Sequence, residues 1–213
     1  MEMTEEKQIT DEGVLDYLYG VLFAPVQTLK RITKKKPLVL ALAVYLIVSW
    51  LTSISPFLAM GEITPFPLRS ANLISGLAVM SLIAIPFALI SIFVLCGFYH
   101  LLAKWLFKLE GEYRGIVSAV GFADFPFIFF APFSLFNNLV GGITGALIYG
   151  LVAFALSVWV IILHIIAIRE NYSTSTGKAV AVYFIPLVIL GLLLIALIVI
   201  AIVLFVRVTS GLY

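Results

Sequence analysis

Residues 179–206 read AVAVYFIPLVILGLLLIALIVIAIVLFV, a run of 28 residues without a single charge. A helix needs roughly 20 apolar residues to cross about 30 Å of hydrocarbon. The run is therefore long enough to span a bilayer. Because it is almost pure Ile, Leu, Val and Ala, we expect this helix to face lipid along most of its surface.

Towards the N-terminus, uncharged runs place four more spans. There are 25 such residues between Lys36 and Glu62, and 34 between Arg69 and Lys104. The 54 residues from 115 to 168 carry only one charge, Asp124, so they must hold two spans. Phe136-Asn137-Asn138 followed by Gly141-Gly142 is a turn signature, which predicts the break between them. The five predicted spans are 37–56, 73–101, 115–135, 142–168 and 179–206.

The composition agrees with a polytopic all-α helix bundle in the membrane. Hydrophobic residues make up 63% of the chain and charged residues 11%, with a mean hydropathy of +1.18. A soluble domain has about 45–50% apolar and about 25% charged residues. This excludes an ordinary soluble enzyme, a disordered chain and a basic nucleic-acid binder. The single cysteine, Cys96, excludes a disulfide framework and a CxxC site.

The basic residues are distributed unevenly between the two sides of the predicted bundle. Eleven of the 13 lie in segment 1–36 and in the loops after the second and fourth spans. Since Lys and Arg concentrate in cytoplasmic loops, we expect a cytoplasmic N-terminus and an external tail at 207–213. No cleavable signal peptide is visible, because residues 1–13 are polar and acidic. The expected location is the cell membrane.

Segment 1–36 is expected to form an acidic tail followed by an interfacial helix. From Val14 onward apolar residues follow a helical period, and Pro25 suits the first turn of a new helix. Val26, Leu29 and Ile32 continue an apolar stripe, which predicts a helix lying on the anionic inner leaflet. The opposite face and the end of the helix are basic: Lys30, Arg31, Lys34, Lys35 and Lys36. Two interpretations stay open, a simple positive-inside anchor and a surface that docks a partner.

Asp124 is the one acidic residue inside a predicted span. A charged carboxylate at a helix centre costs roughly 2.5–3.5 kcal/mol, so it should face the bundle interior. It is either a structural group, protonated and hydrogen-bonded to a neighbouring helix, or part of a proton or cation path. Ser118 is expected to help satisfy this polar network. Pro126 and Pro132 each free a backbone carbonyl nearby.

His100 and His164 lie near the predicted cytoplasmic ends of the second and fourth spans. We expect them to act as interfacial anchors, because two histidines without Cys or an HExxH spacing make a weak metal site. No phosphate loop, nucleophile elbow, dinucleotide motif or paired carboxylate is present. The sequence therefore predicts no enzymatic activity, no cofactor and no metal.

Several short motifs, in their order along the chain, resemble the Yip domain family of Ypt/Rab-interacting membrane proteins. The residues that carry the resemblance are Pro25, His100, Gly111, Ser118, Gly121, Phe122 and Pro126. The resemblance runs from about residue 16 to 206. It implies a Yip-like five-span domain over 37–206, with a cytoplasmic N-terminus.

The resemblance also bears on function. Eukaryotic members are associated with Rab GTPases and membrane traffic, whereas a tail of only 36 residues looks more like the prokaryotic branch. The leading hypothesis is a non-enzymatic protein that organises membrane or docks a protein partner at its cytoplasmic face, in contact with anionic lipid. The alternative is a small transporter or channel component that uses Asp124 as a proton or cation site. That alternative favours a homo-oligomer, because five helices rarely enclose a broad pathway.

Overall fold

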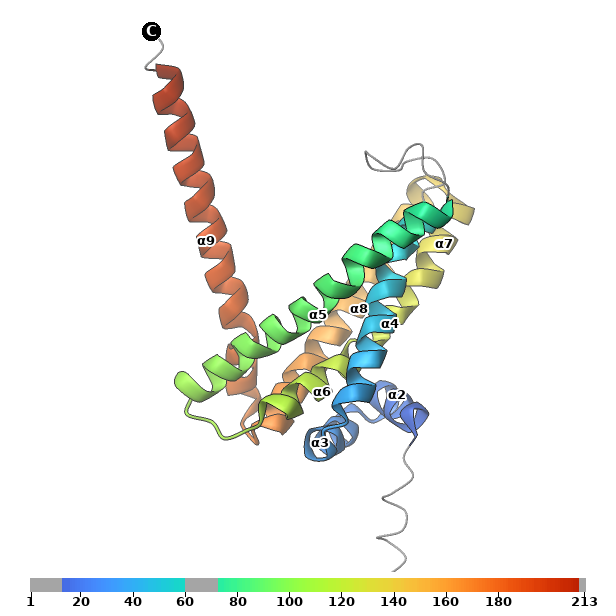
Figure 1. Cartoon of the computed structure of the whole chain (residues 1–213), viewed down its shortest axis with the longest axis vertical. Helices are drawn as coiled ribbons and strands as arrows, with labels where there is room; N and C mark the ends of the chain where they lie inside the picture. Colours follow the sequence, from blue (N-terminus) through green and yellow to red (C-terminus); the bar gives the residue numbers. More distant parts are fainter. Residues whose placement is uncertain (1–12, 60–72, 211–213) are drawn as a thin grey trace, which may run out of the picture.

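The computed structural model describes residues 13–59 and 73–210, and every regular element in these two stretches is helical. Figure 1 shows the arrangement. The helices are α2 (Val14–Phe23), α3 (Pro25–Lys35), α4 (Leu38–Ala59), α5 (Leu73–Trp105), α6 (Tyr113–Ala123), η2 (Phe125–Phe129), α7 (Phe130–Val140), α8 (Gly142–Asn171) and α9 (Thr176–Ser210).

Five apolar helical segments are long enough to cross a membrane, and each corresponds to one predicted span. They are Leu38–Ser55, Ala78–Trp105, Tyr113–Asn137, Gly142–Asn171 and Thr176–Arg207. The all-helical, five-span prediction is therefore confirmed, and the chain is a multi-pass membrane protein.

The third span is not one continuous helix. Helix α6 ends at Asp124, a single 3₁₀ segment (η2) follows, and α7 begins at Phe130. Pro126 lies in the first turn of η2, where it has no N–H to donate to an α-helical hydrogen bond. The Phe127 N–H instead donates to the Asp124 carbonyl at 3.0 Å, which closes the tighter turn.

The reversal between the third and fourth spans lies later than the sequence signature predicted. Phe136 and Asn137 are still helical, within α7. The chain turns at Gly141 and Gly142, whose φ angles are +66° and +59°. This left-handed conformation is accessible to glycine at no steric cost, which explains why the glycine pair rather than the asparagines forms the turn.

Helix α6 forms the centre of the bundle. Every residue from Gly115 to Ala123 is buried, and α6 packs against α3, α4, α5 and α8. Gly121 permits the closest approach, because a Cβ there would lie 2.8 Å from the Ala41 carbonyl oxygen of α4. Phe122 is fully buried beside Tyr17 of α2, with ring centroids 5.3 Å apart. The core thus ties the third span to the N-terminal helices.

Helices α2 and α3 pack across one end of the bundle, as Figure 1 shows. The Gly13 N–H donates to Asp16 Oδ2 at 3.0 Å at the start of α2, and Pro25 is the first residue of α3. Leu29 and Ile32 of α3 are fully buried and pack towards α6 and α8. The prediction that this apolar stripe rests on lipid is therefore wrong for these two residues, because the bundle itself covers them.

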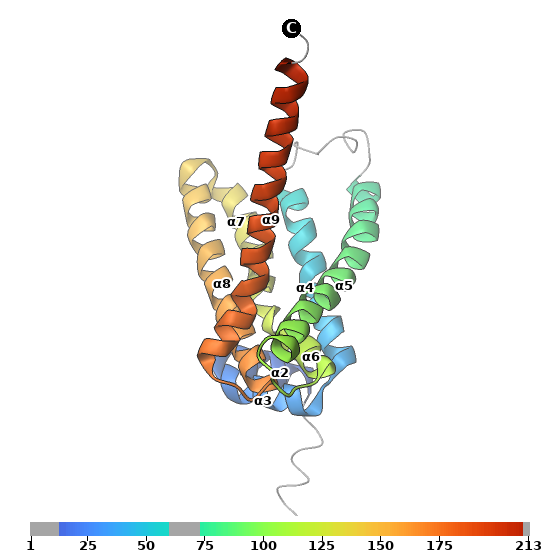
Figure 2. The same cartoon turned by 90° about the vertical axis from the view of Figure 1, so that its left-hand side faces the viewer.

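Helix α9 diverges from the other helices in Figure 1, and Figure 2 shows its C-terminal end extending beyond them. Only its first turns contact α8 and α5, with Ala179 and Val182 buried. From Leu187 to Val206 nearly every side chain is exposed, as expected for a helix surrounded by lipid.

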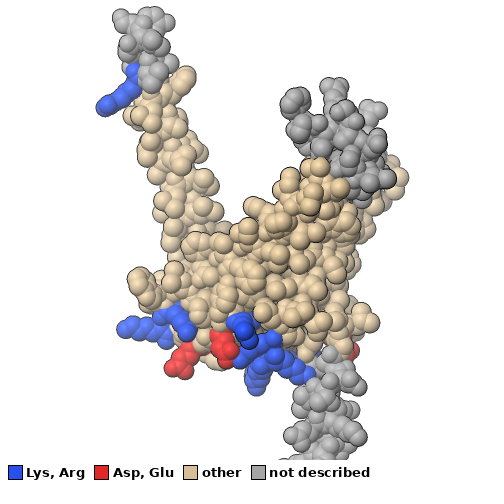
Figure 3. Space-filling view, viewed as in Figure 1, with Lys and Arg blue, Asp and Glu red and all other residues tan. Residues whose placement is uncertain are grey.

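Charged residues of the described stretches gather at one end of the molecule, formed by α2, α3, and the adjoining ends of α5 and α8 (Figure 3). We call this the basic end. In the described part of the chain, the exceptions are Arg207 near the far end of α9 and Asp124 inside the bundle. This separation of charged from uncharged ends matches the uneven distribution of Lys and Arg between the two sides of the predicted bundle.

Candidate functional site

A buried hydrogen bond joins the break in the third span to helix α8. His164 Nε2 lies 2.9 Å from Asp124 Oδ1, and the two side chains are only 7% and 13% exposed. Asp124 is the residue at which α6 stops, so its side chain leaves the helix at the centre of the bundle. The pair consists of one carboxyl group and one imidazole ring. At this distance a proton can transfer between the two atoms.

This geometry corrects the placement of His164. It lies about two helical turns before the end of α8, inside the bundle rather than at the interface. Edge-on tyrosine rings flank it, Tyr183 at 5.9 Å and Tyr99 at 6.4 Å between centroids. The signal that could have located the pair was the presence of two isolated ionisable residues in neighbouring spans, because such residues pair in lipid.

Ser118 does not join this network. Among the described residues its buried Oγ has no hydrogen-bond partner, and the same holds for His164 Nδ1. The expectation that Ser118 helps to satisfy Asp124 is therefore wrong. Ser118 lies on α6 more than one turn before the carboxylate, and the helix break directs Asp124 towards α8 instead.

Asp124 also lines a hollow between α4 and α5. The hollow has a volume of about 290 Å³. Its wall on α4 is polar, with Tyr45, Ser49 and Thr52, whereas Phe127 lies beside Asp124. The Tyr45 hydroxyl lies 3.0 Å from Ser91 Oγ of α5, which ties the two helices together. Asp124 therefore contacts His164 and also lines a groove with hydroxyl groups on its α4 wall.

His100 belongs to a separate cluster. Its Nδ1 lies 2.9 Å from the hydroxyl of Tyr172, a residue just after α8, and its ring meets that of Tyr113 edge-on at 5.6 Å. Burial raises the pKa of Tyr172 above its ordinary value, so this hydroxyl stays protonated. No sequence motif pointed to Tyr172. His100 is half-buried, and its contact with Tyr172 links α5 to the end of α8.

The remaining motif residues are structural. Gly111 lies so close to the Tyr172 ring that a Cβ there would overlap it. Gly121 and Phe122 form the α6 contacts with α4 and α2 described above, and Pro126 is buried in η2. The motifs thus mark the places where the helices approach one another.

The basic residues predicted for the membrane surface all lie on α3 or directly after it. Lys30, Arg31, Lys34 and Lys35 are exposed. Lys36, in a left-handed conformation at φ 51°, ends the helix and bonds to Glu112 before α6. This hydrogen bond and the Lys36 charge lower the pKa of the Glu112 carboxyl.

An exposed apolar ridge runs along α2. Leu15, Tyr19 and Phe23 are spaced by four residues and are 78%, 67% and 69% exposed. The Tyr19 and Phe23 rings lie 4.6 Å apart. The opposite face of α2, with Tyr17 and Val21, is buried. We call these three residues the α2 ridge.

Comparison with known proteins gives one match. The family model of the Yip1 domain matches residues 19–198, from α2 to the middle of α9. No curated protein and no solved structure matches the chain.

Proposed function

The chain belongs to the Yip1 domain family, and from this premise we propose that it is a non-enzymatic protein of the cell membrane that docks a protein partner at the cytoplasmic face. The basic end is the side that we place in the cytoplasm, because loops rich in Lys and Arg stay there. Docking at this end would let the protein organise the membrane in which its five helices lie.

The α2 ridge is the observation that carries the proposal. Leu15, Tyr19 and Phe23 expose contiguous apolar and aromatic surface at the end of the bundle where the charged residues gather. Such patches with polar surroundings are typical of interaction sites, and aromatic side chains are enriched in interfaces. Tyr17 and Val21 fix the helix to the core, so the ridge is already ordered before a partner binds, which lowers the entropic cost of association.

The charge around the ridge favours a protein over the anionic leaflet. Asp16 is exposed within the ridge helix. The sequence before it is acidic, with Lys7 as its one basic residue against Glu2, Glu5, Glu6, Asp11 and Glu12. An anionic lipid surface attracts basic segments and repels acidic ones. A partner with an apolar groove and a basic rim fits this chemistry.

Affinity capture from crosslinked native membranes tests the proposal. The parent chain is compared with a variant carrying Leu15→Ser, Tyr19→Ser and Phe23→Ser, all at exposed positions. The matched control carries Trp105→Ser and Leu106→Ser, two exposed apolar residues at the same end but outside α2. We expect one stoichiometric protein to be lost from the ridge variant and kept by the control. Equal capture by all three chains would contradict the proposal.

A second function has its own support in the Asp124–His164 pair. The two groups lie 2.9 Å apart, and Asp124 also lines the groove between α4 and α5, whose α4 wall carries hydroxyl groups. Paired ionisable groups inside membrane bundles mark proton relays in many transporters. The groove and the pair together could carry a proton or cation through the bundle.

Proton flux into liposomes, followed with an enclosed pH-sensitive dye, tests this second function. If it is correct, Asp124→Asn abolishes the flux of the reconstituted protein, because an amide cannot exchange the proton. Thermal unfolding in detergent checks that the variant folds as the parent does. Equal flux through parent and Asp124→Asn would rule the function out.

A further inference from the structure

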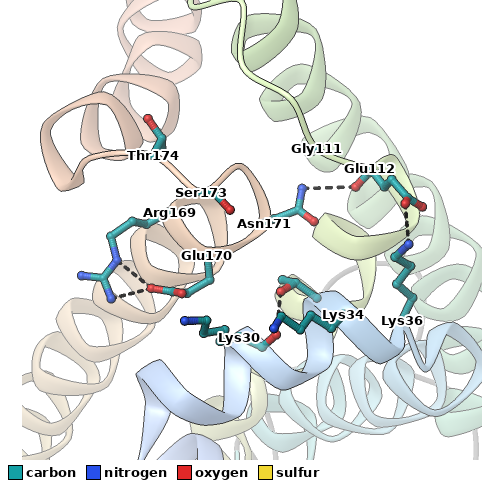
Figure 4. Close-up of a pocket in the computed structure, with 11 residues that line it drawn as sticks. Lys30, Lys34, Lys36, Gly111, Glu112, Arg169, Glu170, Asn171, Ser173 and Thr174 are labelled. Carbon is teal, nitrogen blue, oxygen red and sulfur yellow. Dashed lines mark hydrogen bonds and ion pairs between the residues drawn. The ribbon is translucent and has the colours of Figure 1, made fainter.

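A pocket of about 590 Å³ lies at the basic end, between α3 and the turn that joins α8 to α9 (Figure 4). Lys30 and Lys34 extend into it from α3, one helical turn apart and therefore on one face. Residues just before α6 and at the end of α8 form the opposite wall, among them Glu112, Glu170 and Asn171. The volume lies in the range of small-molecule binding sites, about 300–1,000 Å³.

The two carboxylates in the pocket wall are already neutralised. Lys36 binds Glu112, and Arg169 binds Glu170 through Nη2 at 2.7 Å and Nε at 2.9 Å. Within residues 13–59 and 73–210, neither Lys30 nor Lys34 forms an ion pair. The pocket therefore keeps an excess of two positive charges.

Further donors stand at the rim. Ser173 and Thr174 contribute hydroxyl groups to the lining. The Thr174 N–H donates a hydrogen bond to the Arg169 carbonyl at 3.1 Å. Ser173 has a φ of 44°, a left-handed conformation that is uncommon for a residue with a side chain. The turn is thus held in one shape, and it lines the pocket together with the two lysines of α3.

We propose that this pocket binds a phosphate-bearing ligand, whose phosphate lies between Lys30, Lys34 and the hydroxyl groups of the α8–α9 turn. Lysine ammonium groups bind phosphate as point charges, and charge-assisted hydrogen bonds are roughly twice as strong as neutral ones. The volume exceeds what a bare phosphate fills, which favours a phosphate attached to a larger body, such as the headgroup of an anionic phospholipid. The lining includes residues at the ends of two membrane-crossing segments, Glu112 just before α6 and Asn171 at the end of α8. The inference does not depend on a protein partner at the α2 ridge.

Native mass spectrometry of the full chain in detergent tests the pocket with three probes. These are inorganic phosphate, dioctanoyl phosphatidic acid and dioctanoyl phosphatidylcholine, the last as a lipid without net charge. The parent is compared with Lys30→Gln/Lys34→Gln. The matched control is Lys104→Gln/Lys178→Gln, which removes the same charge from exposed lysines of the same chain outside the pocket.

We expect parent and control to bind phosphatidic acid in preference to phosphatidylcholine. The Lys30→Gln/Lys34→Gln variant should bind it roughly tenfold or more weakly, since each basic residue near an anionic headgroup contributes about one kcal/mol. A competition experiment distinguishes a lipid headgroup from a soluble phosphate ligand. Displacement by an equal concentration of inorganic phosphate identifies a soluble phosphate ligand, and its failure to displace identifies the lipid headgroup.

Two results would overturn the proposal. One is equal affinity of the pocket variant and the parent, and the other is an equal loss in the control, which would indicate non-specific attraction to positive charge. Thermal unfolding of each variant checks the fold. The single variant Lys34→Gln provides the same comparison with half the charge change if the double variant does not fold.

Discussion

Asp124 and His164, which lie 40 residues apart in the chain, are joined by a buried contact of 2.9 Å between Oδ1 and Nε2. The contact links the break in the third span to the middle of α8. A lone carboxylate or imidazole in the same place would be costly, because a buried polar group without a hydrogen-bond partner is unfavourable. The pair therefore explains how the third span can carry an acidic residue at all.

A double-mutant cycle measures this coupling. Asp124→Leu and His164→Leu each leave the other group buried without its partner, which costs about 1–3 kcal/mol. The double variant leaves neither group unpaired, so we expect it to lose less stability than the sum of the single changes. Reversible unfolding in detergent gives the three values. Additive losses would show that the two residues do not interact.

Gly121→Ala should destabilise the bundle by about 1–3 kcal/mol through overpacking. The new Cβ would lie 2.8 Å from the Ala41 carbonyl oxygen and 3.1 Å from the Ala41 Cβ. Gly97→Ala and Gly150→Ala are matched controls, since a Cβ at either helical position meets nothing within 4 Å. We expect the controls to be neutral or slightly stabilising, because alanine favours helix. A thermal midpoint of Gly121→Ala equal to the controls would contradict the close packing of α6 on α4.

The Lys36–Glu112 pair predicts a weak dependence of stability on acidic pH. The pKa of Glu112 is lowered in the folded protein from 4.5, first by the hydrogen bond from Lys36 and then by its charge. The unfolded chain thus takes up the proton first as pH falls. The stabilisation is fully present above 4.5 and is lost below it, as pH falls through the folded pKa.

Unfolding midpoints measured from neutral to acidic pH check this dependence. Since the pair is exposed, the effect should be small. In Lys36→Gln the pKa of Glu112 should return towards its ordinary value. The difference in unfolding midpoint between Glu112→Gln and the parent should vanish at acidic pH. A Glu112 pKa unchanged by Lys36→Gln would show that the pair does not form in solution.

Cysteine labelling tests the orientation of the bundle. In a Cys96→Ser background, Lys178→Cys lies at the basic end and Arg207→Cys at the other end of α9. An impermeant maleimide added to intact cells should label Arg207→Cys and not Lys178→Cys, because Lys- and Arg-rich ends stay in the cytoplasm. Both should react after the cells are opened. The reverse pattern would place the basic end outside.

The lengths of the uncharged runs were sufficient to predict all five spans, since bilayer thickness sets the required number of apolar residues. The run of 28 residues ending at Val206 also predicted the lipid exposure of α9. What could not be predicted were contacts between segments. Leu29 and Ile32 have the same helical spacing whether lipid or α8 covers them. His164 has the same distance from a span end whether it points to water or to Asp124.

Site-specific photocrosslinking from the α2 ridge tests the central claim most directly, because it reports what covers the ridge in native membranes. A benzophenone amino acid replaces Tyr19, or Trp105 as the control, and both positions are exposed, at 67% and 85%. The account predicts a protein adduct of defined mass from position 19, absent from position 105 and lost when Leu15→Ser and Phe23→Ser are added. Lipid adducts alone at position 19, or the same protein adducts at both positions, would contradict partner docking at the α2 ridge.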